Sequence, residues 1–187
     1  MKYTLEGQET GRLKFRLLNI EDFDIWVELF ENIEVCRFLG VDKIETPNER
    51  CKLWFDMTFE RYKNGLGGAN VLIDKFTNKI IGQSGLIVRE IEGKQEIEIA
   101  YSILPEYRKK GFASESTKKC KDFAFENNFS QSLISIINIE NINSEKVARS
   151  NGMRNDKSIE YNGMLVNIYR IDIGEWKKKN ESKTADL

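Results

Sequence analysis

The spacing of hydrophobic residues near the N-terminus predicts one strand followed by one helix. Leu13, Phe15 and Leu17 alternate with basic residues, which is the pattern of a half-buried strand. Asn19 then has a side chain of the kind that helix N-caps favour. The apolar face of the helix that follows would carry Phe23, Trp26, Val27 and Phe30.

A capping box predicts a second helix after Thr46. Pro47 occupies the first helical position, and Glu49 stands three residues after the cap. The segment NGLGG ends this helix. Before it, apolar and aromatic residues recur at helical spacing: Cys51, Trp54, Phe55, Thr58, Phe59 and Tyr62.

Three consecutive strands are predicted in the middle of the chain, at residues 69–73, 79–90 and 95–104. The last of them alternates along its whole length. One face would carry Ile97, Ile99, Tyr101 and Ile103, and the other Glu96, Glu98, Ala100 and Ser102. Pro105 ends this strand because proline has no N–H to donate to the ladder.

The remaining pattern predicts a helix, a strand, a helix and a hairpin in that order. The first three cover residues 111–128, 132–139 and 144–151, with Gly152 as the left-handed end of the short helix. Asn162-Gly163 is the strongest short signal for a tight hairpin. Together these elements predict an α/β fold, with a mixed, mostly antiparallel twisted sheet.

The composition is that of an ordinary soluble globular protein. The chain has 187 residues, 40% of them hydrophobic and 32% charged, which suffices for one core and is short for two. We expect a single domain over residues 1–176 and a solvated, frayed tail over 177–187. The net charge of -1 favours neither nucleic acid nor membrane as a partner. Since signal-peptide and membrane-helix patterns are absent from the sequence, we expect a cytoplasmic protein.

The chain contains no histidine and three cysteines, Cys36, Cys51 and Cys120. Without histidine, Ser/His and Cys/His nucleophile pairs and His-based zinc sites are excluded. The odd number and wide spacing of the cysteines predict neither a disulfide framework nor a metal centre. Catalysed proton transfers would therefore use carboxylates, hydroxyls, thiols or water.

The segment YRKKGFASES places a basic turn between the strand at 95–104 and the helix at 111–128. Amides at a helix start have no carbonyl partners, and the helix dipole adds positive charge, so such a turn can hold a diphosphate. Gly111 lets the chain curl, and Ala113 keeps the first helical turn thin. Walker A and triple-glycine Rossmann motifs are absent; the alternative is a solvated basic loop. Three cations precede the glycine: Arg108, Lys109 and Lys110.

Two blocks of sequence resemble the GNAT superfamily of N-acetyltransferases. EIAYSILPEYRKKGFASES resembles its acetyl-CoA motif, Arg/Gln-x-x-Gly-x-Gly/Ala, filled here by Arg108, Gly111 and Ala113. NINSEKVARSNGM is similar to the Asn-x-x-Ser-x-x-Val-Ala-x-x-x-Gly-Phe stretch of the Rim-type branch, which includes ribosomal-protein N-terminal acetyltransferases. Met153 replaces the usual aromatic residue. The matching positions are Asn141, Ser144, Val147, Ala148 and Gly152.

This resemblance runs from about Arg12 to Trp176, and it implies the GNAT fold with helices on both faces of the sheet. It also implies transfer of acetyl from acetyl-CoA to a primary amine, by direct attack through a tetrahedral intermediate and without a metal. The acceptor would be a protein N-terminus or a small-molecule amine, and the enzyme a monomer or homodimer. The implied cofactor-binding residues are Ile103, Leu104, Arg108, Lys109, Lys110, Gly111, Phe112, Ala113 and Asn141.

In the GNAT fold, the fourth strand would part from the fifth near Pro105. The opened backbone of Ile103 and Leu104 would then bind the pantetheine arm and face the thioester oxygen. Backbone donors of this kind stabilise a developing oxyanion by roughly 3 to 4 kcal/mol each.

The resemblance also implies two catalytic residues. The attacking amine must lose a proton, and Glu98, which matches the glutamate of the family's Glu-Ile-Gly-Tyr segment, is the expected base. Glu96 is the fallback, and the alternative for Glu98 is a surface ion pair. Ser144 would protonate the leaving thiolate, because the tyrosine that many GNATs use is Ala148 here. The alternative for Ser144 is a hydroxyl that caps its helix.

Two other classes of function stay open at this point. One is a non-catalytic module that binds acyl-CoA, and the other is an interaction domain whose basic turn binds no nucleotide. For the enzyme, aromatic residues are candidates for the wall of the acceptor groove, although each is more often a core residue: Trp26, Phe30, Phe38, Trp54, Phe55, Tyr62 and Tyr161.

Overall fold

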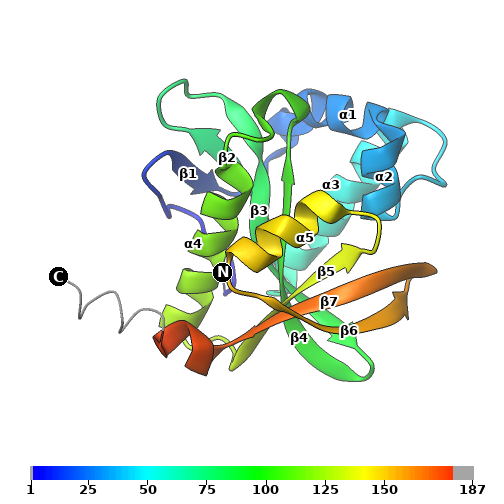
Figure 1. Ribbon diagram of the computed structural model, residues 1–187. Helices are drawn as coiled ribbons and strands as arrows, with labels where there is room; N and C mark the ends of the chain where they lie inside the picture. Colours follow the sequence, from blue (N-terminus) through cyan, green and yellow to red (C-terminus); the bar gives the residue numbers. More distant parts are fainter. Residues whose placement is uncertain (1, 179–187) are drawn as a thin grey trace.

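A seven-stranded sheet with the order β1-β2-β3-β4-β5-β7-β6 runs through the computed structural model, which describes residues 2–178 (Figure 1). Among the strands of these described residues, only β4 and β5 pair in parallel. This confirms the expected α/β fold with a mostly antiparallel sheet. The strands are β1 (Leu13–Arg16), β2 (Gly67–Asp74), β3 (Ile80–Ile91), β4 (Lys94–Ile103), β5 (Ser132–Asn138), β6 (Arg154–Tyr161) and β7 (Met164–Asp172).

Helices cover both faces of the sheet and bury two separate main cores. Val71 of β2 packs in the core beneath α1, α2 and α3, whereas its neighbour Leu72 packs in the core beneath α4. The two residues separate because successive side chains of a strand point to opposite faces. The helices are α1 (Phe23–Glu31), α2 (Ile33–Leu39), α3 (Pro47–Lys63), α4 (Phe112–Glu126) and α5 (Ile142–Ser150).

The capping box at the start of α3 is confirmed. The Thr46 hydroxyl accepts a hydrogen bond from the amide of Glu49, and the Glu49 carboxylate accepts one from the amide of Thr46, both at 3.2 Å. Of the predicted apolar stripe, Trp54 and Phe59 are only partly buried. Trp54 is therefore available to line a surface depression, while the rest of the stripe is core: Cys51, Phe55, Thr58 and Tyr62.

The first helical segment differs from the prediction because it is broken twice. Asn19 caps a short 3-10 turn, Ile20–Asp22, which leads into α1. A second asparagine, Asn32, then ends α1 and caps α2 by accepting hydrogen bonds from two amides. The apolar spacing continues across this break, so it does not mark where one helix ends and the next begins.

The C-terminal hairpin forms as predicted. Asn162 and Gly163 have φ angles of 51° and 73°, the left-handed values that a tight hairpin turn requires. Of the expected tail, residues 177 and 178 belong to a helix that starts at 173, and 179–187 lie outside the described residues. Within residues 2–178, no helix is both long and apolar enough to cross a bilayer.

All three cysteines are free and buried, so we expect them to react slowly with a thiol-reactive dye. Burial raises the pKa of Cys51 to about 12 and that of Cys120 to about 12, and it also raises the pKa of the Cys36 thiol. A raised pKa keeps a thiol in its unreactive protonated form. The thiols of the native protein should react with little of the dye. The protein unfolded in guanidinium should react rapidly with three equivalents of dye, one for each cysteine. Rapid labelling of the native protein would contradict this burial.

Candidate functional site

The parallel strands β4 and β5 separate almost as soon as they meet. Within the described residues, the only pair that joins them is Glu98 with Ile134. At the narrow end of the split, the Ser135 hydroxyl donates a hydrogen bond of 2.9 Å to the carbonyl of Ile99. The split therefore opens at Ile99, earlier along β4 than the expected position near Pro105.

Tyr101 and Ile103 point their backbone groups into this split. The Leu104 amide donates to the Ile81 carbonyl at 3.0 Å and thus continues the ladder between β3 and β4. Because hydrogen-bonded and non-hydrogen-bonded pairs alternate in an antiparallel ladder, the amides of Tyr101 and Ile103 face away from β3. This corrects one expectation, since the Leu104 amide is occupied and Tyr101 takes its place beside Ile103.

The basic turn ends in a helix start that no side chain caps. Gly111 is the N-cap of α4 with φ 84°, a left-handed value that glycine adopts without strain. Lys109 is also left-handed, with φ 60°. The first-turn amides of α4 are therefore not satisfied by a cap, and three exposed cations stand beside them: Arg108, Lys109 and Lys110.

Arg12, which precedes β1, holds this turn in place. Its Nη1 donates to the Lys110 carbonyl at 3.0 Å, and its guanidinium lies over the Phe112 ring, 4.4 Å from the ring centre. Glu115 of α4 accepts from Arg12 Nε at 2.6 Å and from the Thr10 hydroxyl at 2.5 Å. Burial tends to raise the pKa of Glu115, but these hydrogen bonds lower it overall. Arg12 was not among the predicted site residues, because nothing local in the sequence links it to a turn about a hundred residues away.

Together, the turn and the split fit a diphosphate joined to an extended chain. A Cβ added at Gly111 would stand 3.3 Å from Arg12 Nη2, so a larger residue there would crowd the side chain that holds the turn. Uncapped helix amides and nearby cations suit a diphosphate. The amides of Tyr101 and Ile103 suit a chain that lies between two separated strands.

Ser144 does not cap α5. Asn141 does so instead, because its side-chain oxygen accepts a hydrogen bond of 3.0 Å from the Ser144 amide. Ser144 lies beside the phenol of Tyr101 and tends to lower its pKa. Burial raises the pKa of Tyr101 to about 12, so this phenol keeps its proton at neutral pH. The alternation of β4 predicted the face on which Tyr101 lies but not its serine partner.

Glu98 lies on the opposite face of β4 and forms a buried ion pair. Its carboxylate accepts a hydrogen bond of 2.8 Å from Nε of Arg89 on β3, and the residue is only 7% exposed. The surface pair considered from the sequence is therefore a buried pair. Glu96, the fallback base, is held by two hydrogen bonds of 2.8 and 3.1 Å from Arg170 on β7.

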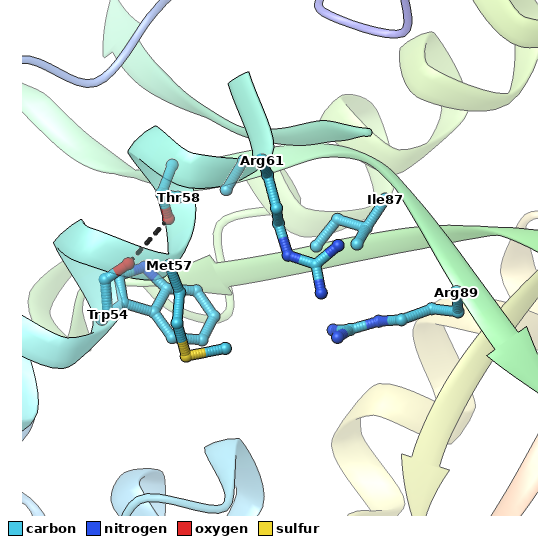
Figure 2. A pocket seen from close by; sticks show the side chains of 7 residues that line it. Trp54, Met57, Thr58, Arg61, Ile87 and Arg89 are labelled. Atoms are coloured by element: carbon cyan, nitrogen blue, oxygen red, sulfur yellow. Dashed lines mark hydrogen bonds between the residues drawn. The ribbon is translucent and has the colours of Figure 1, made fainter. Parts of the chain in front are cut away.

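A small cavity lies beside Arg89, between α3 and the sheet (Figure 2). Arg61 of α3 and Arg89 of β3 extend their guanidinium groups toward the same space. Burial lowers the pKa of Arg61, and the charge of Arg89 lowers it further. The residues that line the cavity are Trp54, Met57, Thr58, Arg61, Ala69, Ile87 and Arg89.

Among the aromatic residues considered for an acceptor groove, Trp54 lines this cavity, and Tyr161 of β6 lies close enough to Arg89 to raise its pKa. Tyr62 is buried, and its hydroxyl bonds to the backbone of Leu18 and Ala69. Phe38 is half-buried in α2. The others are core residues with at most 1% exposure: Trp26, Phe30 and Phe55.

Comparison with known proteins identifies the family. The family model described as "Acetyltransferase (GNAT) domain" matches residues 12–154. The uncharacterized N-acetyltransferase p20 of Bacillus licheniformis is 23% identical over 176 residues, which cover 90% of this chain and 96% of p20.

Two solved structures share the fold. One is spermidine N-acetyltransferase from Vibrio cholerae in complex with CoA and spermine, with a TM-score of 0.71 and 18% identity over 89% of this chain and 99% of that one. The other is RimL, a ribosomal L7/L12 alpha-N-protein acetyltransferase in complex with coenzyme A, with a TM-score of 0.72 and 15% identity over 90% and 98%. With the family match over residues 12–154, these findings lead to one conclusion: the chain belongs to the GNAT acetyltransferase family.

Proposed function

We propose that this protein transfers an acetyl group from acetyl-CoA to a primary amine. The observation that carries the proposal is the split between β4 and β5, which opens next to the uncapped start of α4. Acetyl-CoA has a diphosphate for the turn and an extended pantetheine arm for the split, and it supplies the thioester carbonyl that an amine attacks.

The cofactor residues inferred from the sequence divide into two groups in this proposal. The amides of residues 109–113 bind the diphosphate, and the side chains of Arg108, Lys109 and Lys110 add positive charge at the rim. The amides of Tyr101 and Ile103 bind the arm and the thioester oxygen. Asn141 has its oxygen engaged as a helix cap, so only its amide nitrogen is available to the cofactor.

Glu98 is the proposed base. An amine with a pKa of about 8 to 10 is mostly protonated at neutral pH, so it must lose a proton before or during the attack. One carboxylate oxygen of Glu98 is bound to Arg89, and the other is available to accept that proton, directly or through a water molecule. The backbone of Glu98 forms the last pair before the strands separate, so its carboxylate lies beside the split.

Ser144→Ala is expected to lower kcat by about tenfold or more, because general acid catalysis contributes up to roughly 100-fold or more, and to leave KM for acetyl-CoA nearly unchanged. The Ser144 hydroxyl, which lies beside Tyr101, would donate a proton to the departing thiolate. Steady-state kinetics of the variant checks this, with Ser150→Ala, an exposed serine later in the same helix, as the matched control. An unchanged kcat would remove Ser144 from the mechanism.

The acceptor class is part of the proposal. Structural neighbours include an enzyme named for spermidine and one named for a ribosomal-protein N-terminus, and the sequence resembles the Rim-type branch. We therefore propose a protein N-terminus or a small-molecule amine as the acceptor. The second candidate function, a non-catalytic acyl-CoA-binding module, is supported by the ion pair of Glu98 with Arg89, because this pair occupies part of the carboxylate that is proposed as the base.

Calorimetry with coenzyme A, followed by a coenzyme A release assay with a panel of amines, tests both candidates. The panel would contain N-terminal peptides, amino sugars, polyamines and amino acids. Binding with turnover supports the enzyme, and binding without turnover of any amine supports the module. A protein that does not bind coenzyme A would contradict both.

A further inference from the structure

The cavity between α3 and the sheet contains more positive than negative charge. Arg61 and Arg89 both extend into it, and Glu98 is the carboxylate that pairs with Arg89. None of the residues that line the cavity is acidic. Two guanidinium groups therefore share one carboxylate in a partly buried place, and an anionic ligand would compensate the remaining positive charge.

Both arginines keep most of their hydrogen-bond donors free for a ligand. A guanidinium has five N–H donors in a planar fork. Arg61 donates from Nη1 to the Val88 carbonyl at 3.1 Å, and Arg89 donates from Nε to Glu98 at 2.8 Å. The remaining N–H groups match the two oxygens of a carboxylate, which arginine binds with paired hydrogen bonds.

The position of the cavity connects it to the proposed chemistry. Arg89 contacts Glu98, and Glu98 forms the last pair before β4 and β5 separate. A molecule whose amine lies at Glu98 would thus have its neighbouring atoms near Arg89 and Arg61. The cavity has a volume of about 20 Å³, a little more than one water molecule requires, so only a small terminal group of an acceptor, such as a carboxylate, could enter it.

We propose that Arg61 and Arg89 form an anion site that selects acceptors with a carboxylate a few bonds from the reactive amine. The inference rests on the proposed function, because it names the acceptor class of that same site. Two sources of this carboxylate share the chemistry: the α-carboxylate of a free amino acid and the acidic side chain of an N-terminal residue. Polyamines are disfavoured, since their positive charge would meet that of Arg61.

Calorimetry with acetylated products tests the site without requiring turnover. With coenzyme A present, N-acetylalanine is compared with its amide, and N-acetylaspartate α-amide with N-acetylasparagine α-amide. The first pair probes an α-carboxylate and the second an acidic side chain. We expect the acid of at least one pair to bind about tenfold more tightly than its amide, as charge-assisted hydrogen bonds of about 1.5 kcal/mol predict.

Variants of Arg61 show whether this preference belongs to the cavity. Arg61→Gln should abolish it, and Arg61→Lys should keep part of it, because lysine retains the charge but not the fork. Lys63→Gln, on the exposed end of α3, should leave the preference intact. Calorimetry with coenzyme A alone would verify that each variant is folded.

Several results would overturn the anion site: equal binding of acid and amide in both pairs, no binding of any acid, or a preference that survives in Arg61→Gln. These outcomes are separate from a failure of the proposed function. If no amine is acetylated but the acid preference is present and depends on Arg61, then the proposed catalysis is wrong and the anion site stands.

Discussion

Glu98→Gln is expected to lower kcat by about 100-fold, the low end of the range for loss of a general base. Glutamine keeps the shape of the side chain, but it cannot accept the proton that the attacking amine must lose. The amide oxygen can still accept a hydrogen bond from Arg89, which limits the damage to the buried pair. Coenzyme A release under saturating acetyl-CoA measures the effect.

Glu96→Gln is the matched control for this prediction. Glu96 lies two residues earlier on the same face of β4, and Arg170 binds both of its carboxylate oxygens. This variant should lose some stability and keep most of its turnover. Equal losses in the two variants would point to damage of the sheet, and an unchanged kcat in Glu98→Gln would exclude Glu98 as the base.

Gly111→Val is expected to weaken coenzyme A binding by roughly 100-fold, which corresponds to two charge-assisted hydrogen bonds of about 1.5 kcal/mol each. A side chain at this position would stand against Arg12, at the residue that precedes the uncapped first turn of α4. The φ of 84° is also unfavourable for a β-branched residue. Calorimetry with coenzyme A gives the dissociation constant directly.

Gly93→Val separates this local effect from general strain. Gly93 lies in the turn between β3 and β4 with φ 74°, and an added Cβ there would meet no atom within 4 Å. This variant should show similar backbone strain and bind coenzyme A as the unchanged protein does. If Gly111→Val also binds coenzyme A normally, the turn is not the diphosphate site.

Local signals made part of the fold predictable from the sequence. The capping box of Thr46 and Glu49 and the turn of Asn162 and Gly163 depend on residues no more than three positions apart, and both form as expected. The alternation of β4 likewise placed Glu98 and Tyr101 on opposite faces. In each case, the interactions that determine the conformation are formed between residues of one turn or one strand.

The parts of the site that the sequence did not predict depend on contacts between residues that are distant in sequence. Arg12 donates a hydrogen bond to the carbonyl of Lys110, which is 98 positions later in the sequence. Arg61 lies on a helix that packs on the sheet, and its guanidinium extends toward the same space as that of Arg89. The alternation of residues along a strand also does not indicate over how many residues two parallel strands remain paired. The split was therefore expected near Pro105, although it opens at Ile99.

The central claim is that this chain moves an acetyl group from acetyl-CoA to an amine, and joint measurement of both products tests it most directly. Acetyl-CoA is incubated with the protein and the amine panel, coenzyme A is quantified by its thiol, and acetylated amine is quantified by mass spectrometry. The buried cysteines should keep the protein's own thiols out of this count. We predict that coenzyme A and acetylated amine form in equimolar amounts, and that both form about 100-fold more slowly in Glu98→Gln. Coenzyme A released without acetylated amine, or neither product from any amine despite bound acetyl-CoA, would contradict the claim.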